Sequence, residues 1–137
     1  RPLRVLDVSC GLGLLSIAAA RVGHNVTAVD NDPWTLALAR RNARRNGVRV
    51  NVQSWDIRAP PSAAILSHGP FDVVYSEPGT LIMADYSANP EQKMDDLHRL
   101  LSSGLEELVK LNASLYLFVG SYNPYEKIFQ ASGAISL

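Results

Sequence analysis

Two short segments carry the residues best suited to binding a ligand. The first reads Val-Leu-Asp-Val-Ser-Cys-Gly-Leu-Gly over Val5–Gly13, and the second reads Val-Thr-Ala-Val-Asp-Asn-Asp over Val26–Asp32. An apolar strand that runs into glycines and then a helix lets the backbone approach a ligand closely, and a carboxylate after the next strand can bind ribose hydroxyls. The pair predicts a nucleotide site centred on Gly11, Gly13 and Asp30.

Two kinds of nucleotide could use these glycines. The run Gly11-Leu-Gly-Leu-Leu-Ser16 approximates a dinucleotide fingerprint, and Asp30 follows Gly11 by nineteen residues, which favours NAD. Asp7, however, precedes the glycines, where a carboxylate would repel a pyrophosphate and could instead hold an ammonium group. An acid at this place favours a nucleoside that carries an amine.

The composition is that of an ordinary globular chain. Of 137 residues, 47% are hydrophobic and 19% are charged, enough for a buried core in one domain. Thirteen basic residues balance thirteen acidic ones, so the overall charge favours neither a nucleic acid nor a membrane as partner. No segment reaches the roughly 18 apolar residues of a membrane-spanning helix. We expect a single domain over residues 1–137, trimmed at one or both ends.

The cysteine, histidine and arginine residues give little indication of a disulfide, a metal site or a nucleic-acid partner. Cys10 is the only cysteine, which excludes an internal disulfide and favours a reducing, cytoplasmic location. The three histidines have no ligand spacing, so we expect no metal. Five arginines could contact the phosphates of a nucleic acid, but a run of this kind is more often the solvated face of an outer helix. These arginines are Arg40, Arg41, Arg44, Arg45 and Arg49.

Strand and helix patterns alternate along the chain. Short apolar or alternating runs predict strands at 4–8, 25–30, 49–53, 71–75 and 114–120, and residues 134–137 could form a sixth. Caps and periodic apolar residues predict helices at 14–22, 33–46, 62–66, 91–111 and 124–131, with a loop over 77–90. This alternation predicts an α/β fold, a three-layer sandwich around a mainly parallel, doubly wound sheet.

The residues with chemical potential share one edge of the expected sheet. Ligands of such folds bind outside the carboxyl ends of the strands. The segments 7–13 and 76–79, together with Asp30 and Asp56, all lie at those ends. Each alone could be a turn former, a helix cap or a solvated acid. Their joint placement favours a binding site.

Two motifs resemble those of class I S-adenosylmethionine-dependent methyltransferases. Val5–Arg21 is similar to their glycine-rich motif, and Ala28–Pro33 with the helix after it is similar to their second motif. The resemblance covers residues 5–79 well and the remainder only in the order of helices and strands. It implies a Rossmann-like sheet with its strands, numbered along the chain, in the order 3-2-1-4-5. It also implies S-adenosylmethionine as the cofactor.

The resemblance assigns cofactor contacts residue by residue. Asp7 and the turn after it would face the methionine part of the cofactor, and this turn comprises Ser9, Cys10, Gly11 and Gly13. Asp30 would bind the ribose hydroxyls, with Asn31 beside the adenine. Asp56 would accept from the adenine amino group, and Ile57 would pack against the ring. Ser9 stands where the family usually has its first glycine, which adds a side chain next to the cofactor.

The segment Tyr75-Ser-Glu-Pro-Gly79 lies where this family carries its acceptor-facing motif. Its Ser-Glu-Pro resembles the corresponding stretch of some protein arginine methyltransferases, although their second glutamate and barrel domain have no counterpart. A carboxylate can hold an amine and accept its proton, so Glu77 is the catalytic candidate, with a solvated loop acid as the equal alternative. The acceptor pocket would be lined by Tyr75, Ser76, Pro78 and Tyr122.

The function implied is methyl transfer to an acceptor, such as an amine in a protein, a nucleic acid or a small molecule. Two other functions stay open. An NAD-binding oxidoreductase domain would use the same glycines and Asp30, but Asp7 and Asp56 argue against it. A noncatalytic cofactor-binding or scaffold domain of the same fold would explain Ser9 and the unusual Ser-Glu-Pro.

Overall fold

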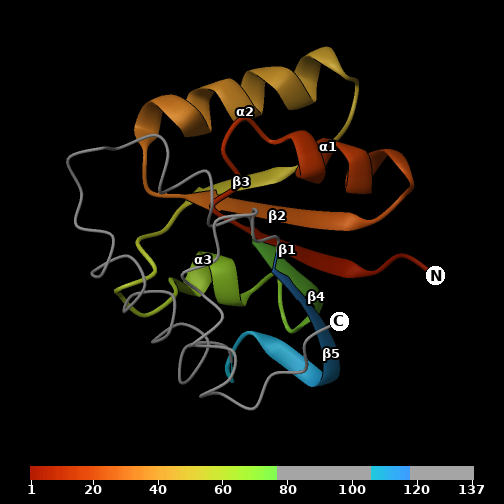
Figure 1. Ribbon diagram of the computed structural model, residues 1–137, viewed down its shortest axis with the longest axis vertical. Helices are drawn as coiled ribbons and strands as arrows, with labels where there is room; N and C mark the ends of the chain where they lie inside the picture. The colour runs from red at the N-terminus through yellow and green to blue at the C-terminus, as the bar shows by residue number, and fades with distance from the viewer. Residues whose placement is uncertain (77–105, 118–137) are drawn as a thin grey trace.

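Five parallel strands form one sheet, in the order β3-β2-β1-β4-β5. The computed structural model describes residues 1–76 and 106–117 (Figure 1). The strands are β1 (Arg4–Val8), β2 (Asn25–Asp30), β3 (Asn51–Ser54), β4 (Phe71–Ser76) and β5 (Val109–Leu117). The α/β fold and the strand order expected from the sequence are therefore confirmed.

Helices flank the sheet on both faces. They are α1 (Leu14–Arg21), α2 (Pro33–Arg45) and α3 (Ala63–Leu66). In Figure 1, α1 and α2 lie above the sheet and α3 lies below it. The chain runs β1-α1-β2-α2-β3 toward one edge and then returns to place β4 on the other side of β1. Strand order thus reverses between β1 and β4, where doubly wound folds bind ligands.

Alternation along β1 sends side chains to two separate apolar layers. Val5 packs toward α1, against Val26 and Leu15. Leu6 faces the opposite layer, which is the larger core. The side chains fully buried there stabilise the fold by roughly 1.5–3 kcal/mol each, and they include Leu6, Val8, Ile65, Phe71 and Leu108.

Local capping explains where the helices begin. The Asp32 side chain accepts from the Thr35 amide at 2.8 Å, and Pro33 takes the first position of α2, where its missing N–H is no loss. Ser62 caps α3 in the same way through the Ile65 amide, at 3.3 Å. α2 ends before Gly47, which has a φ of +66°. These starts agree with the helices predicted from the sequence.

The predicted helix over 91–111 is wrong in its last turn. Glu106 to Leu108 form a turn, and β5 begins at Val109 rather than at Ser114. The Leu108 carbonyl accepts from the Phe71 amide at 2.7 Å, which ties this turn to the start of β4. The pairing register then shifts between Phe71 and Val73, and Asn112 has a φ of +67°. Leu108, whose spacing predicted a helix, is a buried core residue in the turn directly before β5.

Smaller differences concern strand ends. β3 begins at Asn51, two residues later than expected, and extends to Ser54, while β4 reaches Ser76. The remaining predictions lie outside the described residues: the loop over 77–90, the helix over 91–105, the helix over 124–131 and the strand over 134–137. Among residues 1–76 and 106–117, no helix is long and apolar enough to cross a membrane.

Candidate functional site

A tight turn links β1 to α1 at the reversal point of the sheet. Three of its residues have left-handed backbone conformations, with φ values of +62° at Ser9, +54° at Gly11 and +82° at Gly13. The Cys10 amide donates to the Val29 carbonyl and the Gly13 amide to the Cys10 carbonyl, both at 2.9 Å. The turn is therefore anchored to β2.

The two glycines of this turn have different surroundings. A Cβ at Gly13 would meet the Cβ of Ala39 at 3.4 Å, an ordinary van der Waals contact, so the φ of +82° rather than lack of space favours glycine there. A Cβ at Gly11 would have no neighbour within 4 Å. From α2, the Asn42 side chain donates to the Leu12 carbonyl at 3.0 Å and holds the turn from outside. Gly11 therefore leaves bare backbone on the side where a ligand would approach.

Ser9 adopts a conformation that a glycine would adopt without strain. The left-handed region costs a non-glycine residue about 1–2 kcal/mol, while glycine adds about 0.5–1 kcal/mol of unfolded-state entropy. We expect Ser9→Gly to raise the free energy of unfolding by about 0.5–1 kcal/mol in urea denaturation. The matched control is Ser67→Gly, where φ is −65° and the same exchange should destabilise. Equal losses from both substitutions would contradict the argument.

Asp30 joins the two motifs that the sequence singled out. Its Oδ2 accepts from the Gly11 amide and its Oδ1 from the Asp32 amide, each at 3.1 Å. The side chain is buried, with 8% of the residue exposed. Each carboxylate oxygen has a second lone pair, so both can accept a further hydrogen bond. The carboxylate fixes the glycine turn and still offers acceptors for ligand hydroxyls.

Asp7 is the second buried acid of the site. It is 3% exposed and accepts a hydrogen bond from the Ser16 hydroxyl in the first turns of α1. Burial raises the pKa of Asp7 to about 6, against the opposing effects of Ser16 and Tyr75. We did not expect the contact with Ser16 from the sequence, where that serine counted only as a small residue of the fingerprint. The sequence feature that could have predicted this contact is the position of Ser16 in the first turn of α1, the helix that covers Asp7.

Asp56 has a partner of its own at the sheet edge. Its carboxylate accepts from the Arg58 amide at 3.0 Å and from Arg58 Nε at 2.9 Å, and this pairing lowers the pKa of Asp56. Ile57 packs against the core cluster that contains Trp55, whose Nε1 donates to the Ala59 carbonyl at 3.0 Å. The Asp-x-Arg spacing of Asp56 and Arg58 is visible in the sequence, but it did not lead us to predict this pairing. The structure thus places Asp56 in an exposed ion pair.

The expected acceptor side is only partly described. Tyr75 and Ser76 are buried at the end of β4, 8% and 3% exposed. Tyr75 packs with Val5 and Val26 on the face covered by α1, and Asn31 is exposed after β2. Glu77, Pro78 and Tyr122 lie outside the described residues.

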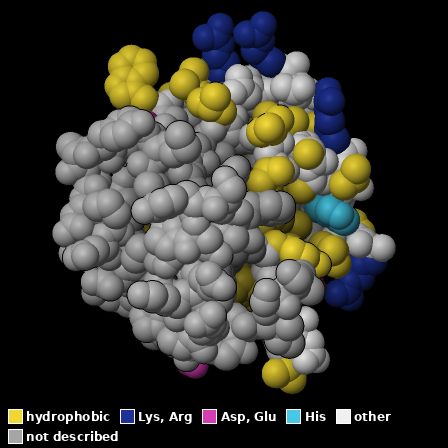
Figure 2. All heavy atoms as spheres, viewed as in Figure 1, with side chains coloured by type: hydrophobic (Ala, Val, Ile, Leu, Met, Phe, Trp, Pro, Cys, Tyr) yellow, Lys and Arg dark blue, Asp and Glu magenta, His cyan; other side chains and the backbone are white. Residues whose placement is uncertain are grey.

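Other candidate groups have ordinary surroundings. Cys10 is buried, and desolvation raises the pKa of its thiol to about 12, which leaves it unreactive. Within the described ranges, no three His, Cys, Asp or Glu side chains gather as a metal site. All five arginines of α2 and its continuation are exposed, and basic side chains stand out above α2 (Figure 2). This exposure agrees with a solvated helix face.

Comparison with known proteins gives a consistent family. A family model described as a methyltransferase domain matches residues 5–104. The ribosomal protein L11 methyltransferase of Thermus thermophilus is 41% identical over 71 residues, 52% of this chain and 26% of that protein. The ubiquinone biosynthesis O-methyltransferase of Xylella fastidiosa is 33% identical over 117 residues, 85% of this chain and 45% of that protein. The chain spans less than half the length of these relatives.

Solved structures share the architecture. A ribosomal protein L11 methylase from Lactobacillus delbrueckii subsp. bulgaricus superposes with a TM-score of 0.66 at 24% identity, covering 96% of this chain and 58% of that one. An S-adenosylmethionine-dependent methyltransferase from Clostridium acetobutylicum gives 0.61 at 21% identity, covering 82% and 41%. At these identities the likeness establishes the fold.

Proposed function

The chain belongs to the methyltransferase domain family, and from that premise we propose that it moves a methyl group from S-adenosylmethionine to a nucleophilic acceptor. The observation that carries the proposal is the Asp30 carboxylate, which binds the Gly11 and Asp32 amides at the reversal point of the sheet. It combines a bare glycine turn with buried acceptors for ribose hydroxyls. A reducing, cytoplasmic location belongs to the proposal and is supported by the buried, unpaired Cys10.

The described residues fit the cofactor that the family implies. Asp30 would hold the ribose hydroxyls, and the turn around Gly11 would lie against the methionine part. Asp7 is a buried carboxylate beside that turn, and a cationic amine would stabilise its charged form. When bound, the cofactor supplies a sulfonium methyl group, and the carbon–sulfur bond breaks as the bond to the acceptor forms. The residues themselves act by positioning the partners.

Asp56 is the one cofactor contact that requires a rearrangement. Its carboxylate already accepts from the Arg58 amide and from the guanidinium. Each Asp56 oxygen already accepts two hydrogen bonds from Arg58, so an adenine amino group would have to displace one of them. We propose that Asp56 gives up one hydrogen bond from Arg58 to accept from the adenine amino group, with Ile57 and Asn31 beside the ring.

Calorimetry separates this function from the dinucleotide alternative. The chain should bind S-adenosylhomocysteine and should not bind NAD, because Asp7 lies where a pyrophosphate would require a neutral or cationic neighbour. Binding of NAD alone would establish the oxidoreductase reading instead. A chain that binds neither nucleotide would favour the scaffold alternative.

For the acceptor we propose an amine held by Glu77, with Ser76, Pro78 and Tyr122 around the pocket. Tyr75, which the sequence also suggested for this pocket, is buried beside Val5 and Val26 instead. In the sequence, Glu77 directly follows Ser76, the last residue of β4, and β4 ends at the same edge of the parallel sheet as β1 and β2. A carboxylate can orient an amine by charge-assisted hydrogen bonds and accept the proton that it loses. The exposed arginines of α2 could contact the phosphates of a nucleic-acid acceptor, but this is the weaker proposal because such a run is more often a solvated helix face.

Labelled methyl transfer tests this assignment. With S-adenosylmethionine as donor, label should enter the nitrogen of lysine- or arginine-containing peptides rather than the oxygen of a catechol. We expect Glu77→Gln to lower turnover about tenfold with unchanged cofactor affinity, since the reaction needs alignment more than a strong base. Glu106→Gln, an exposed acid in the turn before β5, is the control. Transfer to the catechol alone would contradict an amine acceptor.

A further inference from the structure

The Tyr75 hydroxyl is buried without a hydrogen bond. Among the residues that the structure describes, it is the one buried side-chain oxygen or nitrogen that lacks a partner. A buried hydroxyl without a partner costs free energy, because it loses its bonds to water and gains none in return. Phenylalanine would fill the same apolar space beside Val5 and Val26 at no such cost. An unpaired group of this kind in a native structure calls for an explanation.

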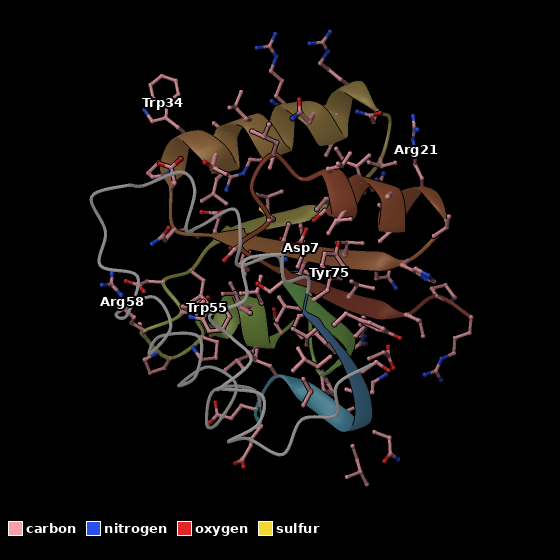
Figure 3. The ribbon with its side chains drawn as sticks, in the orientation of Figure 1. Asp7, Arg21, Trp34, Trp55, Arg58 and Tyr75 are labelled. Atoms are coloured by element: carbon pink, nitrogen blue, oxygen red, sulfur yellow. The ribbon has the colours of Figure 1, made fainter. Side chains whose placement is uncertain are left out.

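Its surroundings contain both a strong acceptor and a donor. Tyr75 and Asp7 are direct partners in the register of β4 and β1, and both side chains lie on the face covered by α1. Figure 3 labels the two side chains next to each other near the middle of the sheet. The Ser16 hydroxyl, from α1, donates to one oxygen of Asp7. The Tyr75 hydroxyl is near enough to influence the pKa of Asp7 but meets neither group with hydrogen-bond geometry.

The protonation state of Asp7 determines how strongly its side chain accepts a hydrogen bond, because the charged carboxylate is a stronger acceptor than the neutral acid. Burial and the neighbouring Asp30 both disfavour the charged form of Asp7. A cationic amine close to Asp7 would favour the carboxylate, whose second oxygen would then be a stronger acceptor for a phenol. Tyr75 is the described side chain placed to donate to it.

We infer that Tyr75 is a positioning residue for Asp7, recruited into a hydrogen bond when the site takes a ligand that carries an ammonium group. The inference rests on the proposed function, because it assumes that the amino acid end of S-adenosylmethionine lies beside Asp7. Tyr75 then contributes to the binding of the amino acid end of the ligand and contributes nothing to the binding of its nucleoside. Its hydroxyl is kept at a cost in the free protein and is satisfied in the complex.

A pair of ligands isolates this role. S-adenosylhomocysteine carries the amino acid end, whereas methylthioadenosine has the same nucleoside and sulfur without it. We expect Tyr75→Phe to weaken the first ligand about tenfold in calorimetry, the loss of one charge-assisted hydrogen bond. Affinity for methylthioadenosine should not change. The melting temperature of the free variant should equal or exceed that of the wild type.

The control is Tyr116→Phe, since Tyr116 is the register partner of Tyr75 on β5 and is half exposed. It should change neither affinity. Ser16→Ala is a second variant on Asp7 and should also weaken S-adenosylhomocysteine more than methylthioadenosine.

Three results would overturn the inference alone, with wild-type binding intact. They are equal losses for both ligands in Tyr75→Phe, no loss for either, or a lower melting temperature of the free variant. If the wild type bound neither ligand, the proposed function would fall, and this inference with it.

Discussion

Asp30→Asn should lower the affinity for S-adenosylhomocysteine by at least about a hundredfold, because the substitution removes a buried charge that serves both motifs. In the wild type, each carboxylate oxygen accepts from one backbone amide, that of Gly11 or that of Asp32. An asparagine offers one oxygen, so its NH₂ must face one of those amides as a second donor. The turn would lose an anchor, and the ribose hydroxyls would lose a charged acceptor. Calorimetry at neutral pH measures the change.

The control for this experiment is Asp32→Asn. Asp32 is an exposed carboxylate two residues further on, and it caps α2 through the Thr35 amide. Asparagine caps helices about as well as aspartate, so the variant removes one charge and leaves the turn intact. Its affinity should stay within about threefold of the wild type. Similar losses in both variants would mean that Asp30 acts only through net charge, and the ribose role would be wrong.

The cofactor half of the site could be predicted because its determinants are local. The glycine turn lies directly between β1 and α1, and Asp30 ends the next strand, so short spacings bring them together through one βα unit. The strand order follows from the alternation of strands and helices combined with the family resemblance. These features depend on backbone conformation and on neighbouring elements, which leave clear signals in a sequence.

The parts that the sequence did not reveal depend on contacts between elements. The leucines before Val109 have helical spacing, which predicted a helix as far as Leu111. Pairing with β4 instead places Val109 in strand β5, and Leu108 packs in the core with Phe71. Arg58 pairs with Asp56 through side-chain geometry that spacing alone does not fix. The unpaired hydroxyl of Tyr75 appears only once β1, β4 and α1 are packed together. Tertiary packing, rather than local propensity, decides each of these cases.

The Asp7→Asn variant should be more stable than the wild type near pH 7 and of similar stability near pH 4. Asp7 has a pKa of about 6 in the folded protein, above its ordinary value of 3.8. The difference corresponds to about 3 kcal/mol of folding free energy, an upper limit for a group that is almost fully buried. Asparagine is neutral at every pH, so it avoids that cost. Its oxygen can still accept from Ser16, and its NH₂ can donate to the Tyr75 hydroxyl.

The sign of this effect follows from proton binding. Between pH 3.8 and about pH 6 the folded protein holds the Asp7 proton more tightly than the unfolded chain does. The stability contributed by neutral Asp7 is therefore fully present below pH 3.8 and is lost as the pH rises through about 6. Urea denaturation of both proteins from pH 4 to pH 7.5 measures the difference, which should widen by about 2–3 kcal/mol in favour of the variant. Parallel curves would show that Asp7 carries its charge in the fold without cost. A widening gap would mean that the chain keeps an acid where a neutral residue folds better, as expected if a cationic ligand group needs it.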